Sequence, residues 1–283
     1  MNAIHAKTRP YRVGMIVPSS NTTMETEIPA LLQRQSAVDG SRFTFHSTRL
    51  RLRHVAPEAL QAMNDAAGDA VDALCDSQVD TVMYACLLAT MFGGKASVVE
   101  TGQRLARRAN YMRAAPVSVV TSADALIAAL HSLGAQSISM IAPYRKELTA
   151  RVTATIEEHG IVVRQAVSLE IADDVAVGRL DQQTLLSMAC ELDLANSDAL
   201  VLSAGVQMPS IEVLDAVEQL LGLPVLSAAS ASVWALLQKL RIEPQVKAAG
   251  WLLRSSCAHA NAHAHAHAHA HAHAHAHEER QAA

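Results

Sequence analysis

The chain has 283 residues, of which 50% are hydrophobic and only 3% aromatic, and its formal net charge is −4 at pH 7. This composition predicts a globular protein and argues against nucleic-acid binding, which usually needs a basic face or aromatic stacking platforms. No stretch approaches the roughly 18 apolar residues of a membrane helix, the N-terminus has no run of signal-peptide length, and four cysteines lack metal-ligand spacing, so we expect a cytoplasmic protein.

Strand-like runs alternate along the chain with amphipathic, helix-like stretches such as 57–76 and 145–159. Gly134, Gly160 and Gly222 close three of the helical stretches, as glycine does where a helix ends in a left-handed conformation. Repeated strand–helix–strand units predict a mostly parallel sheet. The expected strands are 12–19, 42–50, 79–86, 115–122, 137–143, 161–169, 197–205 and 224–230.

The strand pattern repeats at a second level. "VGMIVPSSN" at 13–21 is similar to "ISMIAPYRK" at 138–146, and "VDTVMYACLLATM" at 79–91 is similar to "SDALVLSAGVQMPS" at 197–210. We interpret the fold as α/β, with two similar Rossmann-like lobes that have parallel sheets and are related by a pseudo-two-fold axis. The predicted lobes are 8–117, with 225–255 packing back on it, and 118–224. The alternative is that any two βαβ units look alike.

Four turns fall at the predicted carboxyl ends of strands, where parallel α/β sheets bind ligands. They are 18–21 and those containing Cys86, Tyr144 and Gly205. If the lobes face each other, all four converge on one cleft between them. The cleft is therefore the expected site.

The first of these turns opens a helix. Thr22 and Glu25 have the spacing of a capping box, and the helix N-terminus that follows offers free N–H groups to an anion. Asn21 could add its amide to a bound carboxylate, or could simply cap the helix.

Cys86 could be a thiolate nucleophile, because nearby helix N-termini lower the pKa of a thiol. It could equally be a buried cysteine that behaves as a small apolar residue. We assign Cys75 and Cys190 to helices. Arg49 and Arg51 could steer an acidic substrate or be solvated charges, and His46 is interpreted as structural.

Residues 258–283 form a tail in which alanine and histidine alternate over most of its length. Such histidines could hold Zn²⁺ or Ni²⁺ weakly. The simpler interpretation is an expanded repeat that stays disordered, and we expect no metal site.

Taken together, "YRVGMIVPSSNTTMETEIPALL", "RFTFHSTRLRL", "YACL", "APY", "SLEIADD" and "VLSAGVQMPS" resemble the maleate cis-trans isomerase family, within the aspartate/glutamate racemase superfamily. The similarity runs from about Tyr11 to about Leu253. The resemblance implies two lobes around a small dicarboxylate, a homo-oligomer (a homodimer), and no cofactor. It also implies a cysteine thiolate that adds to maleate, after which the adduct rotates and expels fumarate.

Carried over by position, Cys86 resembles the family's nucleophile, with the backbone N–H groups of Leu87 and Leu88 beside it. Asn21 and Tyr144 resemble its substrate-binding residues. Val206 and Gln207 resemble the residues of the second lobe whose backbone holds the substrate.

Two positions depart from the family pattern. Gly205 stands where the second cysteine, the proton donor, is expected, and Asp174 stands where a substrate-binding asparagine is expected. The resemblance therefore implies an isomerase of reduced activity with an altered proton donor. A protonated Asp174 is one candidate for that donor. The alternatives are a one-thiol decarboxylase or other superfamily enzyme on a small carboxylate, and a non-catalytic carboxylate-binding protein.

Overall fold

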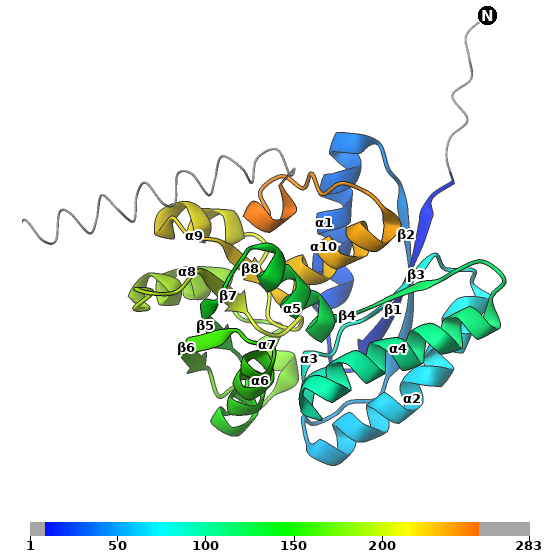
Figure 1. Ribbon diagram of the computed structural model, residues 1–283, viewed down its shortest axis with the longest axis horizontal. Coiled ribbons are helices and arrows are strands. Elements are labelled where there is room, and N and C mark those ends of the chain that lie inside the picture. Colours follow the sequence, from blue (N-terminus) through cyan, green and yellow to red (C-terminus); the bar gives the residue numbers. More distant parts are fainter. Residues whose placement is uncertain (1–8, 255–283) are drawn as a thin grey trace, which may run out of the picture.

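The computed structural model describes residues 9–254, which form two four-stranded sheets in which every pairing is parallel. The strand orders, β2-β1-β3-β4 and β6-β5-β7-β8, match position for position, so the repeat predicted from the sequence is confirmed (Figure 1). The strands are β1 (Tyr11–Pro18), β2 (Phe43–Leu50), β3 (Thr81–Tyr84), β4 (Ser118–Thr121), β5 (Ser137–Ala142), β6 (Val162–Ser168), β7 (Ala199–Ser203) and β8 (Val225–Ser227).

Helices cover both faces of the first sheet. α2 and α4 pack together on one face, and α1 and α10 pack together on the other. Residues of β1 alternate between the two cores, as the two-residue period of a strand requires: Val13 and Met15 face α1, whereas Ile16 faces α2. The helices are α1 (Met24–Asp39), α2 (Pro57–Asp76), α3 (Leu87–Met91), α4 (Gly94–Met112), α5 (Ser122–Ser132), α6 (Lys146–Glu158), α7 (Asp174–Val177), α8 (Gln182–Glu191), α9 (Leu214–Leu221) and α10 (Ala228–Leu240).

The lobe boundary lies later than the sequence predicted. Residues 118–121, assigned above to the second lobe, form β4 and pair with β3 in the first sheet. Conversely, 225–227 form β8 in the second sheet. Within the predicted 225–255 segment, α10 packs back on β3 and β4, where it also contacts α5, and residues 243–248 hydrogen-bond to Arg34 and Gln35 of α1. In each lobe, the fourth strand (β4 or β8) completes the sheet, and the helix that follows it (α5 or α10) packs at the junction of the lobes.

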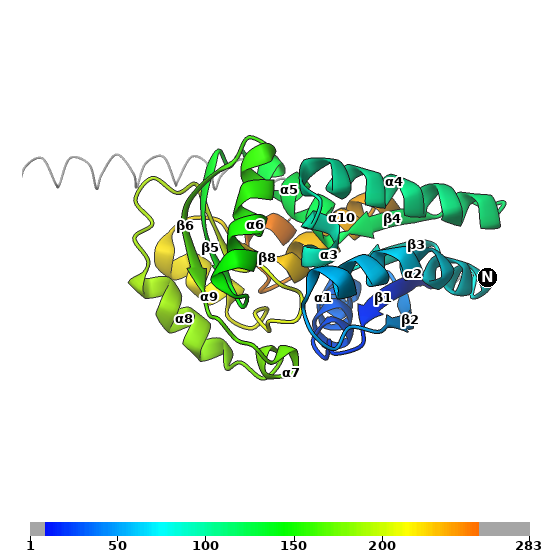
Figure 2. The ribbon, with the colours of Figure 1, turned by 90° about the horizontal axis from the view of Figure 1, so that it is seen from below.

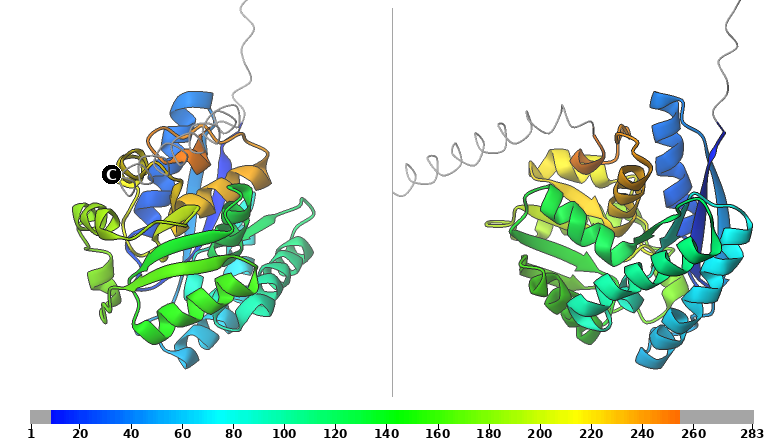
Figure 3. Two further views of the ribbon diagram at one scale, coloured as in Figure 1. Left: turned by 60° about the vertical axis from the view of Figure 1, so that its left-hand side comes forward. Right: turned by 45° about the vertical axis from the view of Figure 1, so that its right-hand side comes forward.

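The two sheets lie in separate halves of the molecule, as both views of Figure 3 show, and the short helix α3 lies between the halves (Figure 2). Gly134, Gly160 and Gly222 have φ of 71°, 83° and 68°, which confirms the predicted left-handed helix ends. Among residues 9–254, no helix is long and apolar enough to cross a membrane. The alternating Ala/His tail lies outside the described residues.

Two glutamates are buried in this fold. Glu27 is 4% exposed and Glu218 is 0% exposed. Desolvation raises the pKa of each to about 7 from an ordinary 4.5, against the opposing effect of two backbone N–H donors at each carboxylate.

We expect the free energy of unfolding to decrease as the pH rises from about 4.5 to about 7. Both carboxyls bind a proton more tightly in the folded chain than in the unfolded chain, so folding takes up protons in this window. Ionisation of each carboxyl lowers the free energy of unfolding by up to about 3 kcal/mol across this window. Urea unfolding of wild type and Glu218→Gln between pH 4.5 and 8 tests this expectation, since the variant should show the weaker pH dependence. Equal slopes would contradict it.

Candidate active site

Cys86 lies at the carboxyl end of β3 and directly precedes α3. It is 8% exposed and extended, with φ of −129°, and its carbonyl oxygen accepts the first hydrogen bond of the helix, from the Thr90 N–H at 3.1 Å. The N–H groups of Leu87 and Leu88 therefore belong to the first helical turn, where N–H groups have no acceptor within the helix. The backbone N–H of Ala89, in the same turn, hydrogen-bonds to the Cys86 sulfur.

Gly205 occupies the corresponding turn of the second lobe, at the end of β7. The Ser203 hydroxyl closes this turn, because it donates to the carbonyl oxygens of Gly205 (3.0 Å) and Met208 (2.9 Å). The Met208 N–H also donates to the Gly205 oxygen, at 3.0 Å. Val206 and Gln207 lie at the centre of the turn, as Leu87 and Leu88 do in the first lobe.

The side chain of Gln207 links its own turn to residues 20–22 of the first lobe and to the start of α7. Its Oε1 accepts from the Thr22 N–H at 2.9 Å, and its Nε2 donates to the carbonyl oxygens of Ser20 (3.2 Å) and Asp174 (2.6 Å). Sequence comparison predicted a role only for the Gln207 backbone. The structure shows that its amide also holds the two lobes in register.

Asn21 caps α1, where the sequence pattern had suggested a Thr22–Glu25 capping box. Asn21 Oδ1 accepts from the N–H groups of Thr23 (3.0 Å) and Met24 (2.8 Å), while Glu25 pairs with Arg49 instead. The capping-box prediction is wrong because the helix begins at Met24, one residue later than the box requires.

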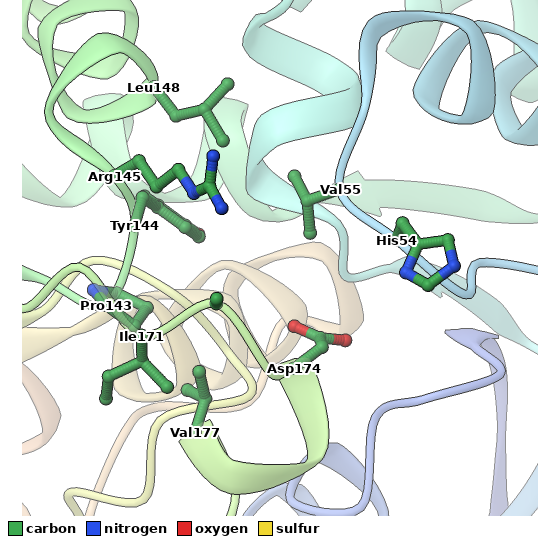
Figure 4. A pocket seen from close by; sticks show the side chains of 10 residues that line it. His54, Val55, Pro143, Tyr144, Arg145, Leu148, Ile171, Asp174 and Val177 are labelled. Carbon is green, nitrogen blue, oxygen red and sulfur yellow. The ribbon is translucent and has the colours of Figure 1, made fainter.

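A pocket of about 230 Å³ opens between the lobes beside these turns (Figure 4). Tyr144 and Asp174 line it, whereas Cys86, Asn21 and Gly205 are buried and do not. The sequence analysis missed two basic side chains of the lining, His54 and Arg145, because their place in the pocket depends on how the two lobes pack and not on a local pattern. Its full lining is His54, Val55, Pro143, Tyr144, Arg145, Leu148, Ile171, Ala172, Asp174 and Val177.

Tyr144 fills the space in front of Gly205. Its hydroxyl donates to the Ala204 carbonyl oxygen at 3.3 Å, and a Cβ built on Gly205 would lie 2.7 Å from that hydroxyl. Gly205 does not have a positive φ, so its backbone would accept a side chain. The obstacle to a side chain at 205 is therefore the tyrosine.

The thiol, the phenol and a carboxylate influence one another across the site. Burial raises the pKa of Cys86 to about 12, with a partial offset from the Ala89 backbone and a further increase from the charge of Asp174. Burial raises the pKa of Tyr144 too, as do the charges of Cys86 and Asp174. The pKa of Asp174 is itself raised by burial, against a hydrogen bond from Ser20. The resting thiol is therefore protonated at neutral pH.

The other residues singled out from the sequence lie apart from this group. His46 contacts the Thr44 hydroxyl at 3.1 Å, and Cys75 is buried against the Ala109 carbonyl. Cys190 is exposed on α8. Arg49 supports the site indirectly, since it donates to the Asn21 carbonyl oxygen. Within residues 9–254, no group of three or more His, Cys, Asp or Glu side chains is placed to hold a metal.

Comparisons with known proteins agree with this geometry. A family model described as arylmalonate decarboxylase matches residues 13–253. The maleate isomerase of Geobacillus stearothermophilus is 46% identical over 245 residues, 86% of this chain and 97% of that protein. A maleate isomerase from Pseudomonas putida S16, solved with maleate as a cysteine-to-alanine variant, is 40% identical with a TM-score of 0.85, covering 88% of this chain and 99% of that one.

A further relative bears on the covalent chemistry of the cysteine. The maleate cis-trans isomerase of Nocardia farcinica, solved as a cysteine-to-serine variant with a covalently bound succinylcysteine intermediate, is 38% identical with a TM-score of 0.83, over 87% of this chain and 99% of that one. Two facing α/β lobes with a cysteine at the end of β3 define the class, a two-lobed enzyme of the aspartate/glutamate racemase type. The chain belongs to the arylmalonate decarboxylase family and, within it, to the maleate isomerases.

Proposed function

We propose that this protein converts maleate, or a close cis-dicarboxylate, to fumarate through a covalent adduct on Cys86, with an altered proton donor. The observation that carries the proposal is the position of Cys86: a thiol between the end of β3 and the start of α3, close enough to Asp174 of the inter-lobe pocket lining to sense its charge, in a member of the maleate isomerase family. We also propose that it works in the cytoplasm as a homo-oligomer, which family membership supports and sedimentation velocity tests.

The reaction needs no net proton. The Cys86 sulfur adds to one alkene carbon of maleate, the double bond becomes single, and the electron pair moves onto the other carbon and its carboxylate. Rotation about the new single bond and loss of the thiolate restore the double bond in the trans form. The N–H groups of Leu87 and Leu88 on one side, and of Val206 and Gln207 on the other, are placed to stabilise the carboxylate where charge develops.

The thiol proton needs an acceptor, because the pKa of Cys86 is about 12. We assign this role to Asp174, whose charge influences both Cys86 and Tyr144. Once protonated, Asp174 no longer repels a substrate carboxylate and becomes an acid that can return the proton. Asp174 would thus replace the donor that Gly205 lacks, with His54 and Arg145 of the pocket lining attracting the dianion.

Asp174→Asn is expected to bind a dicarboxylate at least about tenfold more tightly, because a buried negative charge is removed. The same change should lower maleate turnover by about 100-fold or more, because asparagine accepts no proton. Calorimetry with succinate and a fumarate assay measure the two effects separately. Unchanged binding together with unchanged turnover would place Asp174 outside the site.

The raised pKa of Cys86 and the glycine at 205 favour a second candidate, a carboxylate-binding protein without catalysis. Incubation of the purified protein with maleate, followed by chromatographic measurement of fumarate, distinguishes the two. Mass spectrometry of Cys86 after a short incubation and acid quench reports the adduct. Fumarate formation supports the isomerase, whereas succinate binding with neither fumarate nor an adduct supports the binding protein.

A further inference from the structure

Glu27 is a charged side chain in an unusual place. It lies in the first turn of α1, in the first lobe, and it is almost completely buried. Its Oε1 accepts from the N–H groups of Ser210 at 2.6 Å and Ile211 at 3.0 Å, both in the second lobe. Its Oε2 is buried and has no hydrogen-bond partner among residues 9–254.

This arrangement is costly for stability alone. A buried carboxylate loses its hydration, and an oxygen without a partner recovers none of that loss. A carboxylate does, however, make hydrogen bonds to N–H groups about twice as strong as those of a neutral acceptor. Glu27 thus holds Ser210 and Ile211 through two hydrogen bonds at one oxygen, and the burial of an ionisable group opposes that hold.

The segment that Glu27 holds is the one that forms the second-lobe side of the site. It begins with the turn at Gly205, and the first lobe contacts it at two more points: the Thr23 hydroxyl donates to the Gln207 carbonyl oxygen at 2.7 Å, and the Thr22 N–H donates to the Gln207 side chain. Residues 22–27 of the first lobe therefore hold residues 207–211 of the second.

We propose that Glu27 is a positioning residue, which fixes segment 205–211 so that the N–H groups of Val206 and Gln207 point at a substrate carboxylate. The inference deepens the proposed function and rests on it only for the identity of the ligand. Glu27 itself contacts no substrate in this scheme and acts through the segment that it holds.

Ionisation of Glu27 should loosen the segment, because the buried carboxylate regains its hydration when segment 205–211 opens, and a pKa that is raised in the closed state means that the proton favours that state. The pKa of Glu27 is about 7, so this change falls near neutral pH. Glu212 raises this pKa and Arg34, which pairs with Glu212, lowers it. On the same helix Glu25 pairs with Arg49, and the pocket adds His54 and Asp174.

Glu218 provides a matched control. It is also buried, its pKa is also about 7, and its Oε1 also accepts two backbone N–H groups, from Val225 at 3.0 Å and Trp251 at 2.8 Å. Those contacts join β8 to the 3₁₀ turn at Trp251–Leu253 and do not touch segment 205–211. A purely structural effect of a buried glutamate should appear equally in Glu27→Gln and Glu218→Gln.

Hydrogen exchange of the full-length protein tests the proposal without any ligand. Protection factors of peptides covering 205–211, corrected for intrinsic exchange, should fall roughly fivefold in wild type between pH 6 and pH 8. Glu27→Gln should remove this fall, and Glu218→Gln should keep it. A fall that persists in Glu27→Gln, or no fall in wild type, would overturn the proposal, and the wild-type series decides even if a variant fails to fold.

Succinate binding by calorimetry provides the second readout. The ratio of wild-type to Glu27→Gln affinity should decrease about fivefold from pH 6 to pH 8, and taking this ratio cancels contributions that both proteins share from His54 and Asp174. A constant ratio with measurable binding would refute the positioning role. Absence of succinate binding in every protein would instead count against the proposed function, and the exchange experiment would still decide on Glu27.

Discussion

Replacing Cys86 with alanine is expected to abolish conversion of maleate to fumarate, with a loss on the order of 10⁴-fold or more. The reaction depends on a covalent bond to the sulfur, and no other thiol among the described residues lies between a strand end and the helix that follows it. Cys75 is buried between α2 and α4 against the Ala109 carbonyl, and Cys190 is exposed on α8. The fumarate assay and mass spectrometry of the adduct measure the effect.

Cys190→Ala is the matched control for this change. It removes a thiol of the second lobe that contacts only the Leu186 carbonyl oxygen of its own helix, so activity and melting temperature should stay near those of wild type. Equal activity of Cys86→Ala and wild type, with the variant folded by circular dichroism, would rule out the covalent mechanism. Succinate binding should survive in Cys86→Ala, because the N–H groups at the site remain.

Gly205→Cys is expected to raise maleate turnover, by up to about 100- to 10,000-fold if proton transfer limits the rate. The topological match between β3 and β7 places residue 205 opposite Cys86, so a thiol there adds a proton donor on the second lobe. The backbone permits the change, since Gly205 does not have a positive φ. The new Cβ would lie 2.7 Å from the Tyr144 hydroxyl, so the tyrosine must move away.

Gly205→Ala separates the two effects of this substitution. It displaces Tyr144 as the cysteine does but adds no acid, so its turnover should equal or fall below that of wild type. A gain in Gly205→Cys that Gly205→Ala lacks identifies the thiol as the cause. If the folded cysteine variant shows no gain, even when combined with Tyr144→Phe to relieve the contact, proton donation from position 205 does not limit this enzyme.

The sequence alone was sufficient to predict the elements, their parallel arrangement and the family. These depend on local properties: the apolar runs of β1 and β5, the alternation of strands with amphipathic helices, and glycines such as Gly134 and Gly160 where helices end. Internal repetition extended this local information to the whole molecule, because two copies of one pattern fold alike. The same pattern predicted that Cys86 and Gly205 occupy equivalent turns.

The tertiary structure alone decided how the two lobes meet. The place of β4 depends on its pairing with β3, and the choice of Asn21 over Thr22 as the cap depends on where α1 begins, neither of which a residue pattern specifies. No residue pattern assigned a role to Glu27, His54 or Arg145, which gain their roles from segments far away in the chain. The high pKa of Cys86 likewise comes from burial by both lobes, since desolvation is set by packing and not by neighbours in the sequence.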